Sequence, residues 1–543
     1  MNAPDHRGRA DLLLPWVLAV LSGVMVGISF PPWDRPWLSW LPWVALAPLC
    51  WALWMMDLPV RRALRCFLLG WVTGTVSFLI SLFWITTVTG PGWVALCLIL
   101  GLYPACWALF AGVVLRAFGE QGDSGMAWLG SFRNLCTAVL AAASWTAAEW
   151  MRGTLFSGFG WNSLGVAQSG NIPMIQIAGI TGTAGLTFLC ALMSATLAIT
   201  LRRIPREIRL RRSRPHADFL LVVLLVAFVF GYGVRRLTAP ASETIPLRVA
   251  GIQGNVPVYD YWDTRCEERI MAGYVRQTKL ALTTRPDLVV WPEAATPRPL
   301  LLDEIIAGQV KELAAGTPAD FLIGSVHYEA EPRGDYNSAI LLTDHAARAQ
   351  IYNKVHLVPF GEFVPFRRLF PPLAWIVGDR VKYDFDPGKG PAVLELAVKP
   401  VKLGPLICFE DTLGDLARGF AALGAQLLVT LTNDGWFEHS IASRQHLANA
   451  RLRTVETGLP LLRVADTGVT CLIDRFGRLR DLLCGPDGNT FVEGILQVSV
   501  PVPARPEPTF YTRHGELFAE TCLGVTLAAL LGWLVAAARF RDR

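Results

Sequence analysis

The stretch Gly404-Pro405-Leu406-Ile407-Cys408-Phe409-Glu410-Asp411 places a cysteine at the end of a short apolar run and follows it with an aromatic residue and two acids. An apolar run of this length is typical of a buried strand, and a strand that ends at Cys408 can present the sulfur at the rim of a sheet. A thiol in that position is a candidate nucleophile. A free cysteine is also commonly an inert core residue, so this stretch alone leaves both interpretations open.

The region around Cys408, residues 245–500, alternates strand-like and helix-like segments. We expect strands at 247–253, 287–292, 320–327, 337–343, 403–409 and 426–433, and helices at 263–282, 414–423 and 443–457. Strands that alternate with helices indicate an α/β domain.

A second motif, Val290-Trp291-Pro292-Glu293, also stands at the end of a strand-like run. Proline cannot lie in the middle of a sheet, so the strand ends there and Glu293 follows at its edge. An acid that is partly desolvated beside Trp291 and Pro292 would have a raised pKa and could act as a general base. The alternative is an ordinary exposed acid on a loop.

A third motif runs from Tyr352 to Pro365 and places Lys354 among apolar neighbours, with Glu362 eight residues further on. A cation here could stabilise an oxyanion, although a surface lysine with its stem on apolar surface would give the same pattern. The three motifs together supply a complete acyl-transfer chemistry. Glu293 would take the proton of Cys408, the thiolate would attack a carbonyl, and Lys354 with the backbone N–H of Phe409 would stabilise the oxyanion that leads to a thioester.

The remainder of the chain predicts a membrane protein. Of its 543 residues 52% are hydrophobic and only 17% are charged, where a soluble chain has about 25% charged residues. Apolar segments of about 20 residues predict spans near 12–30, 38–56, 66–88, 94–116, 135–151, 179–201, 218–234 and 517–538. The first segment lacks a clear cleavage site and is followed at once by another span, so we do not expect a removed signal peptide.

Arginines predict the orientation of these spans. The arginine-rich loops are those near residues 7–9, 61–65, 116–133, 202–214 and 539–543. By the positive-inside rule these loops are cytoplasmic, as are both termini. We therefore expect a membrane domain of seven helices at 1–240, a catalytic domain outside the cytoplasm at 241–505, which is the periplasm in a bacterium, and a last helix with a cytoplasmic tail at 506–543.

Several other features limit the interpretation. The 11 cysteines form no C-x-x-C pair and no Cys/His cluster with zinc spacing, so we expect neither a metal nor another cofactor. The net charge of +5 is small and gives no reason to expect nucleic acid as a partner. His356, His439 and His446 are not needed by a Glu-Lys-Cys triad, and we expect His356 to form structural hydrogen bonds.

Two stretches are candidates for contact with lipid. The outer loop 149–174 is rich in glycine and aromatic residues and contains Glu149 and Arg152. It is either an aromatic belt at the membrane interface or a lipid-facing wall of the active site. The apolar, proline-broken stretch 363–377 is interpreted as an arm that dips into the membrane and gates the site, with packing inside the domain as the alternative.

The motifs Trp291-Pro292-Glu293-Ala294, Tyr352 to Glu362 and Ile407-Cys408-Phe409-Glu410, in this order, resemble those of the nitrilase superfamily. With seven spans before them and one after, residues from about 10 to 540 resemble the apolipoprotein N-acyltransferase family. This resemblance implies an αββα sandwich with the triad Glu293, Lys354 and Cys408. It implies transfer of an acyl chain, in two steps, from a phospholipid of the phosphatidylethanolamine type to the N-terminal amine of a diacylglyceryl-modified apolipoprotein in the bacterial inner membrane.

The resemblance also implies a set of substrate-binding residues: Trp262, Glu362, Phe409, Glu410 and Trp436. Two departures from the family pattern, Glu438 in place of a glycine and Ser443-Arg444 where a proline is common, affect loops and not the triad. We expect a monomer. The alternatives are a membrane-tethered amidase of the nitrilase type that passes its acyl group to water, and a catalytically silent lipid or lipoprotein binder.

Overall fold

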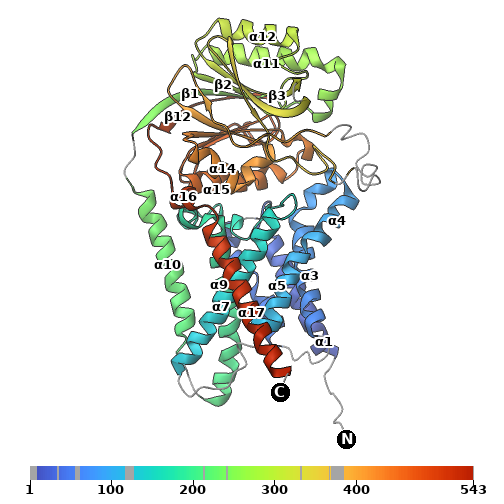
Figure 1. Ribbon diagram of the computed structural model, residues 1–543, viewed down its shortest axis with the longest axis vertical. Helices are drawn as coiled ribbons and strands as arrows, with labels where there is room; N and C mark the ends of the chain where they lie inside the picture. Colours follow the sequence, from blue (N-terminus) through green and yellow to red (C-terminus); the bar gives the residue numbers. More distant parts are fainter. Residues whose placement is uncertain are drawn as a thin grey trace. The chain divides into compact units, whose positions relative to one another are not determined.

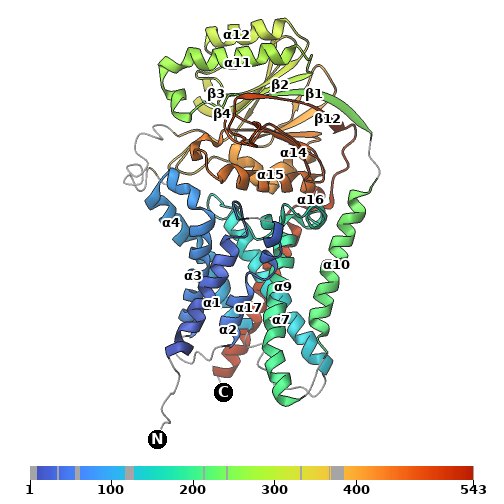
Figure 2. The same cartoon turned by 180° about the vertical axis from the view of Figure 1, so that it is seen from behind.

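The computed structural model describes residues 9–33, 36–55, 62–115, 127–211, 215–239, 243–330, 333–365, 367 and 384–541. The chain divides into two compact units, one made of Met1–Thr238 with Glu516–Arg543 and the other of Ala239–Gly515. Figures 1 and 2 show the helices of the first unit and the sheets of the second.

The first unit is helical. Its helices are α1 (Arg9–Gly27), α2 (Ala47–Met55), α3 (Arg62–Ser81), α4 (Gly90–Leu100), α5 (Leu102–Phe110), α7 (Ala127–Thr154), α8 (Ile172–Ile175), α9 (Ala178–Leu210), α10 (Ala217–Leu237) and α17 (Leu517–Arg541). Five helical stretches among the described residues are long and apolar enough to cross a membrane: Arg62–Ser81, Gly90–Leu115, Ala178–Arg209, Ala217–Leu237 and Leu517–Arg539. Leu12–Gly27 and Leu41–Trp54 are shorter apolar helices. The expected total of eight spans therefore stays a prediction.

Small residues allow α3 and α5 to pack closely. A Cβ on Gly70 would lie 2.4 Å from the carbonyl oxygen of Pro104 and 2.5 Å from Cβ of Ala108. Glycine at this position lets the two backbones approach each other, as is common between helices in membranes.

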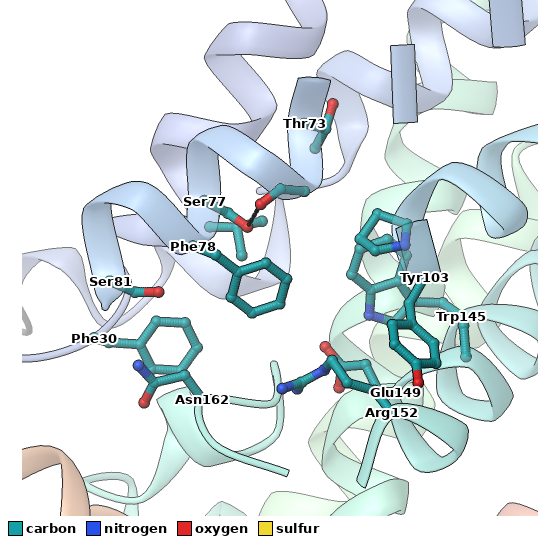
Figure 3. A pocket seen from close by; sticks show the side chains of 14 residues that line it. Phe30, Thr73, Ser77, Phe78, Ser81, Tyr103, Trp145, Glu149, Arg152 and Asn162 are labelled. Atoms are coloured by element: carbon teal, nitrogen blue, oxygen red, sulfur yellow. Dashed lines mark hydrogen bonds between the residues drawn. The ribbon is translucent and has the colours of Figure 1, made fainter. Parts of the chain in front are cut away.

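Two charged residues near the end of α7, Glu149 and Arg152, hold the loop that follows this helix. Nη1 of Arg152 donates to the carbonyl oxygens of Phe159 and Trp161, both at 2.7 Å. Glu149 accepts from the backbone N–H of Leu164 at 3.0 Å and from the Thr187 hydroxyl at 2.9 Å. Both side chains line a small cavity of about 20 Å³. Figure 3 shows Glu149, Arg152 and Tyr103 on one side of it, with Phe30 and Phe78 opposite.

The outer loop expected from residue 149 begins only after Thr154, because Glu149 and Arg152 belong to α7. From there the two side chains fix the backbone of the loop. Trp161 is buried, so this tryptophan packs within the unit and is not part of an exposed aromatic belt. The interpretation of the loop as an interfacial belt is wrong for this residue.

The second unit contains two six-stranded mixed sheets. The first has the order β12-β1-β2-β3-β4-β5 and is formed by β1 (Thr244–Gln253), β2 (Leu288–Trp291), β3 (Asp320–Ala330), β4 (Arg333–Thr343), β5 (Arg348–Asn353) and β12 (Gly494–Pro503). The second has the order β11-β10-β9-β8-β7-β6 and is formed by β6 (Leu394–Glu395), β7 (Lys402–Ile407), β8 (Leu427–Thr432), β9 (Leu461–Ala465), β10 (Cys471–Ile473) and β11 (Leu479–Leu482). In each sheet three strands are parallel, β1-β2-β3 and β7-β8-β9, and the other neighbours are antiparallel.

These sheets form the middle of a four-layer sandwich. Helices α11 (Glu267–Leu282) and α12 (Glu304–Ala315) cover the first sheet, and α14 (Gly414–Ala422) and α15 (Ala442–Thr457) cover the second (Figures 1 and 2). The core between the sheets contains buried aliphatic residues from both, including Leu247, Val290, Leu322, Leu406, Leu428 and Val464. Because β2, β7 and β8 are buried on both faces, their sequences are nearly all apolar.

Every strand and helix predicted for this unit is present, with ends that differ by at most four residues, whereas β5, β6, β9 to β12 and α12 were not predicted. Two of these differences change the start of α11 and the end of β7. The helix expected from residue 263 begins as α11 at Glu267, because Asp263 caps a preceding turn by accepting from the N–H of Arg265 at 3.0 Å. The strand expected to end at 409 ends at Ile407, and Cys408 begins a short 3-10 helix, η9 (Cys408–Thr412).

Candidate active site

Cys408 occupies a strained turn at the carboxyl end of β7. Its φ is 53°, in the left-handed region that a residue other than glycine adopts at a cost of about 1 to 3 kcal/mol. The turn is closed by Glu410, whose Oε2 accepts from the N–H of Ile407 at 2.8 Å. A sharp turn between a strand and a helix is the device by which many hydrolases expose a nucleophile above a sheet.

Glu293 lies just beyond the end of β2 and is only 6% exposed. Its Oε1 accepts from Nδ2 of Asn337 at 2.8 Å, and its Oε2 accepts from the backbone N–H of Asn433 at 3.0 Å. Burial raises the pKa of Glu293 and the nearby Glu362 raises it further, while Lys354 opposes both. The acid is therefore a stronger base than an exposed glutamate, and the interpretation of Glu293 as an ordinary loop acid is wrong.

Lys354 directly follows β5 and is 1% exposed, so it is not a surface lysine. Its Nζ lies 2.9 Å from Oε1 of Glu362 and 3.5 Å from Oε1 of Glu293. Burial would lower the pKa of Lys354, but the two carboxylates raise it above its ordinary value. The lysine therefore remains a cation between two acids.

The Cys408 thiol is buried in the electrostatic field of these groups. Burial raises the pKa of the thiol well above its usual value, Glu293 raises it further, and Lys354 lowers it. The resting thiol is therefore protonated at neutral pH. A base must accept its proton before the sulfur can act as a nucleophile. Glu293, whose own pKa is raised, is the acid with the largest effect on the pKa of the thiol.

The predicted substrate-binding residues differ from one another in burial and in the groups that they contact. Glu362 lies inside the site, where its Oε2 also accepts from the N–H of Val358 at 2.8 Å. The Phe409 ring stacks on that of His356 with centroids 5.6 Å apart. Trp436, on the turn after β8, is 42% exposed. Trp262 ends a 3-10 turn, Val258–Trp262, and its side chain lies outside the described part of the structure.

Glu410 has surroundings that differ from those we expected of a substrate-binding acid. Its side chain is fully buried, and its Oε1 accepts from the N–H groups of Val355 and His356 at 2.7 and 3.0 Å. Tyr352 donates its hydroxyl to the same carboxylate at 2.9 Å. Burial raises the pKa of Glu410 to about 7, against Lys354 and these N–H groups. The carboxylate thus joins the segment after β5 to the turn after β7.

Two family models match the two parts of the chain that the sequence distinguishes. Residues 22–196 match the family model of the apolipoprotein N-acyltransferase N-terminal domain, and residues 248–501 match that of carbon-nitrogen hydrolase. Over 528 residues the chain is 36% identical to an apolipoprotein N-acyltransferase of Geobacter metallireducens, covering 95% of each chain. The chain belongs to the apolipoprotein N-acyltransferase family. The resemblance inferred from the three motifs is confirmed.

Other relatives agree with this assignment. The apolipoprotein N-acyltransferase of Rhodopseudomonas palustris is 32% identical over 552 residues, which cover 96% of each chain. Among solved structures, a carbon-nitrogen hydrolase from Helicobacter pylori G27 is similar to 51% of this chain and 95% of its own, with 17% identity and a TM-score of 0.37. The match of residues 248–501 to the carbon-nitrogen hydrolase family gives the second unit a nitrilase-like fold, here with two mixed sheets.

The sequence did not reveal every residue that builds the site. Asn337 donates Nδ2 to both Glu293 and Glu362, at 2.8 and 2.9 Å, and so holds the two acids around Lys354. The one signal was its position, a polar residue within a run that otherwise reads as a buried strand. Within the part of the chain that the structure describes, no group of three or more His, Cys, Asp or Glu residues is arranged to hold a metal ion.

Proposed function

We propose that this chain transfers a fatty acyl group from a phospholipid to the N-terminal α-amino group of a diacylglyceryl-modified apolipoprotein, through an acyl thioester on Cys408. The family supports an acyltransferase that acts on lipoproteins. The observation that supports the mechanism is the 3.5 Å contact between Lys354 and Glu293, two charged groups that both act on the pKa of the Cys408 thiol.

In the first step the Glu293 carboxylate takes the proton of the Cys408 thiol, and the thiolate attacks the ester carbonyl of the phospholipid. Lys354 and the N–H of Phe409 stabilise the oxyanion of the tetrahedral intermediate. The C–O bond then breaks, the lysophospholipid leaves with the proton from Glu293, and the acyl group stays on sulfur. Phosphatidylethanolamine is the donor that we expect from the family.

In the second step the α-amine of the diacylglyceryl-cysteine attacks the thioester. Glu293 accepts a proton from the attacking amine, the same two donors hold the new oxyanion, and the thiolate of Cys408 leaves and recovers its proton. The product is an amide, and the enzyme returns to its resting state. No cofactor takes part in this sequence.

The other residues have supporting roles in this proposal. Glu362 holds Lys354 in place through the 2.9 Å ion pair, and Glu410 positions the turn around Cys408 and does not contact substrate. Trp436 is exposed enough to contact an acyl chain, and we assign Trp262 to the substrate entry on the family resemblance alone.

We further propose a bacterial inner-membrane monomer with eight spans, a catalytic domain at 241–505 outside the cytoplasm and both termini inside. Five long apolar helices, two shorter ones and the 28-residue α7 supply enough segments for eight. The apolar arm at 363–377 is part of this proposal, although all but 363–365 and 367 lie outside the described residues. Replacing Phe370, Trp375 and Ile376 with Ser should slow acyl transfer from vesicle lipid, and an unchanged rate would remove the arm from the mechanism.

The test is the intact mass of the purified protein after incubation with phospholipid. We expect a long-chain acyl adduct that is absent from Cys408→Ser and is discharged by a diacylglyceryl peptide but persists in water. Rapid discharge by water would favour the tethered amidase, and the absence of any adduct would favour a silent binder. Glu293→Gln and Lys354→Ala should both abolish the adduct, and normal acylation of either variant would refute the role assigned to that residue.

A further inference from the structure

Four charged side chains are buried behind the Cys408 turn, and none of them has a part in the chemistry described above. They are Asp411 on η9, Asp434 on the 3-10 turn Asp434–Phe437 after β8, His446 on α15 and Arg463 on β9. All four are almost fully buried. Two acids face two bases, so the cluster can be electrically neutral.

His446 connects this cluster to the nucleophile. Its Nε2 lies 3.1 Å from the backbone carbonyl oxygen of Cys408 and 2.7 Å from Oδ1 of Asp411. Its Nδ1 lies 2.9 Å from Oδ1 of Asp434 and 2.9 Å from Nη2 of Arg463. Carbonyl and carboxylate oxygens only accept hydrogen bonds, so Nε2 must carry a proton.

The carboxylates of Asp411 and Asp434 favour the positively charged form of the His446 ring. Burial alone would lower the pKa of His446, and Arg463 also lowers it, but Asp411 and Asp434 raise it to about 9. Arg463 in turn pairs with Asp434 at 3.0 Å. The bond from His446 to the Cys408 carbonyl is therefore charge-assisted, which makes it stronger than a neutral hydrogen bond.

The carbonyl oxygen of Cys408 and the N–H of Phe409 belong to the same peptide group. The group is planar, and among the described residues only Pro31-Pro32 has a cis bond, so the oxygen and the N–H point in opposite directions. A donor that fixes the oxygen therefore fixes the direction of the N–H. A cation on the oxygen also polarises the peptide and strengthens its N–H as a donor.

We propose that His446 is a positioning residue that holds the Cys408-Phe409 peptide so that the Phe409 N–H faces the oxyanion formed during acyl transfer. The inference rests on the proposed function, since it needs an oxyanion at this place. It also explains how Cys408 is kept at a φ of 53°, because an unfavourable backbone angle persists only where its surroundings enforce it.

The competing explanation is that His446 only neutralises the buried acids and does not position the peptide. Paired variants distinguish these two explanations. Asp411→Asn together with His446→Gln removes one acid and one cation but keeps an amide that can donate to the carbonyl. Asp411→Asn together with His446→Leu has the same charge balance and no donor. His446→Asn, whose amide is too short to reach the carbonyl, replaces the leucine variant if that protein fails to fold.

The experiment measures two reactions of Cys408 in folded, full-length protein. One is acylation by phosphatidylethanolamine, which passes through an oxyanion, and the other is alkylation by iodoacetamide, which does not. We expect the leucine pair to be acylated about 10- to 100-fold more slowly than the glutamine pair, since loss of a whole oxyanion donor costs about 100- to 1,000-fold. Alkylation should be equal in the two.

His345→Leu is the matched control. Nδ1 of His345 also lies 3.1 Å from a carbonyl oxygen, that of Ala314, but this histidine is on the turn before β5 and not at the site. It should be acylated at the wild-type rate. Equal acylation of the two paired variants would overturn the role of His446, as would alkylation that falls in parallel with acylation. Wild-type protein that takes up no acyl group would instead overturn the proposed function, and this inference with it.

Discussion

Replacing Glu362 with Gln should change the pH dependence of Cys408 acylation, because Glu362 and Glu293 share the same two partners. Nζ of Lys354 lies 2.9 Å from Oε1 of Glu362 and 3.5 Å from Oε1 of Glu293. Nδ2 of Asn337 lies 2.9 and 2.8 Å from the same two oxygens, which places them no more than about 6 Å apart. Two buried carboxylates at this distance repel each other whenever both are ionised.

The size of the effect follows from that distance. Two like charges about 6 Å apart at an effective dielectric constant of about 20 repel by roughly 3 kcal/mol, or about two pH units in the pKa of Glu293. Burial is the larger cause of the raised pKa and will remain in the variant, as will the opposing effect of Lys354. We therefore expect Glu362→Gln to lower the pKa of Glu293 by about one to two pH units.

The assay is the single-turnover rate of Cys408 acylation from phospholipid, followed by intact mass between pH 4.5 and 9. The rate rises with pH as Glu293 loses its proton, so the acid limb of the profile reports the pKa of Glu293. In Glu362→Gln this limb should move to lower pH by about one to two units, and the plateau should fall about tenfold because a weaker base removes the thiol proton.

The matched control is Glu395→Gln, which neutralises an exposed glutamate that pairs with Lys402 at 2.7 Å on β6 and β7. Its pH profile should coincide with that of the wild type. An acid limb that stays at the wild-type pH in folded Glu362→Gln protein would refute the reasoning. Either Glu362 would then be uncharged in the native site, or Glu293 would not be the base.

Three further predictions concern the groups around the triad. Lys354→Met leaves two buried acids without their cation. The rate of acylation should therefore fall at least about 100-fold, and the free energy of unfolding by about 3–5 kcal/mol. Thermal unfolding at the wild-type temperature would contradict the burial of the ion pairs. Tyr352→Phe removes a donor to Glu410 and should cost about 1–2 kcal/mol, with acylation slowed less than tenfold; an unchanged Tm would show that this bond is dispensable. The pKa of His446 is about 9 in the folded protein, against 6.5 in an unfolded chain. Protonation of His446 therefore raises the free energy of unfolding by roughly 3 kcal/mol at most. This stabilisation is complete below pH 6.5 and is lost as the pH rises through 9. Apparent Tm should therefore fall between pH 7 and 10, and fall less in the Asp411→Asn, His446→Gln protein; parallel losses would refute this assignment.

The sequence was sufficient to select the three groups that we propose to be reactive, because each directly follows, or nearly follows, a strand. Pro292 ends β2 just before Glu293, and an apolar run ends at Cys408, so neighbouring residues carry the signal. The resemblance of the three motifs to those of the family then implied that the groups belong to one site. The residues alone did not show whether Lys354 is buried, since a buried lysine and a snorkelling surface lysine have the same neighbours in the sequence.

The sequence was less informative about the residues that support the triad. Glu410 matched an acid expected to bind substrate, but its oxygens are taken by Tyr352 and by three backbone N–H groups. These donors come from β5, from the segment after it and from β7. The role of a buried acid depends on which donors surround it, and no local pattern records that.

The amino-acid sequence by itself determined the two kinds of unit and indicated the side chains that we propose to be reactive. Hydropathy and strand periodicity arise from residues close together in the chain, and a cysteine, a lysine and a glutamate at strand ends are visible without coordinates. Only the tertiary structure decided that Asn337 joins the two acids and that His446 holds the Cys408 carbonyl. These contacts link a strand to the turns that carry Glu293 and Glu362, or a helix to a turn, across 25 to 44 residues of sequence. The close packing of buried layers selects them, because each buried polar group must find a partner where water is excluded.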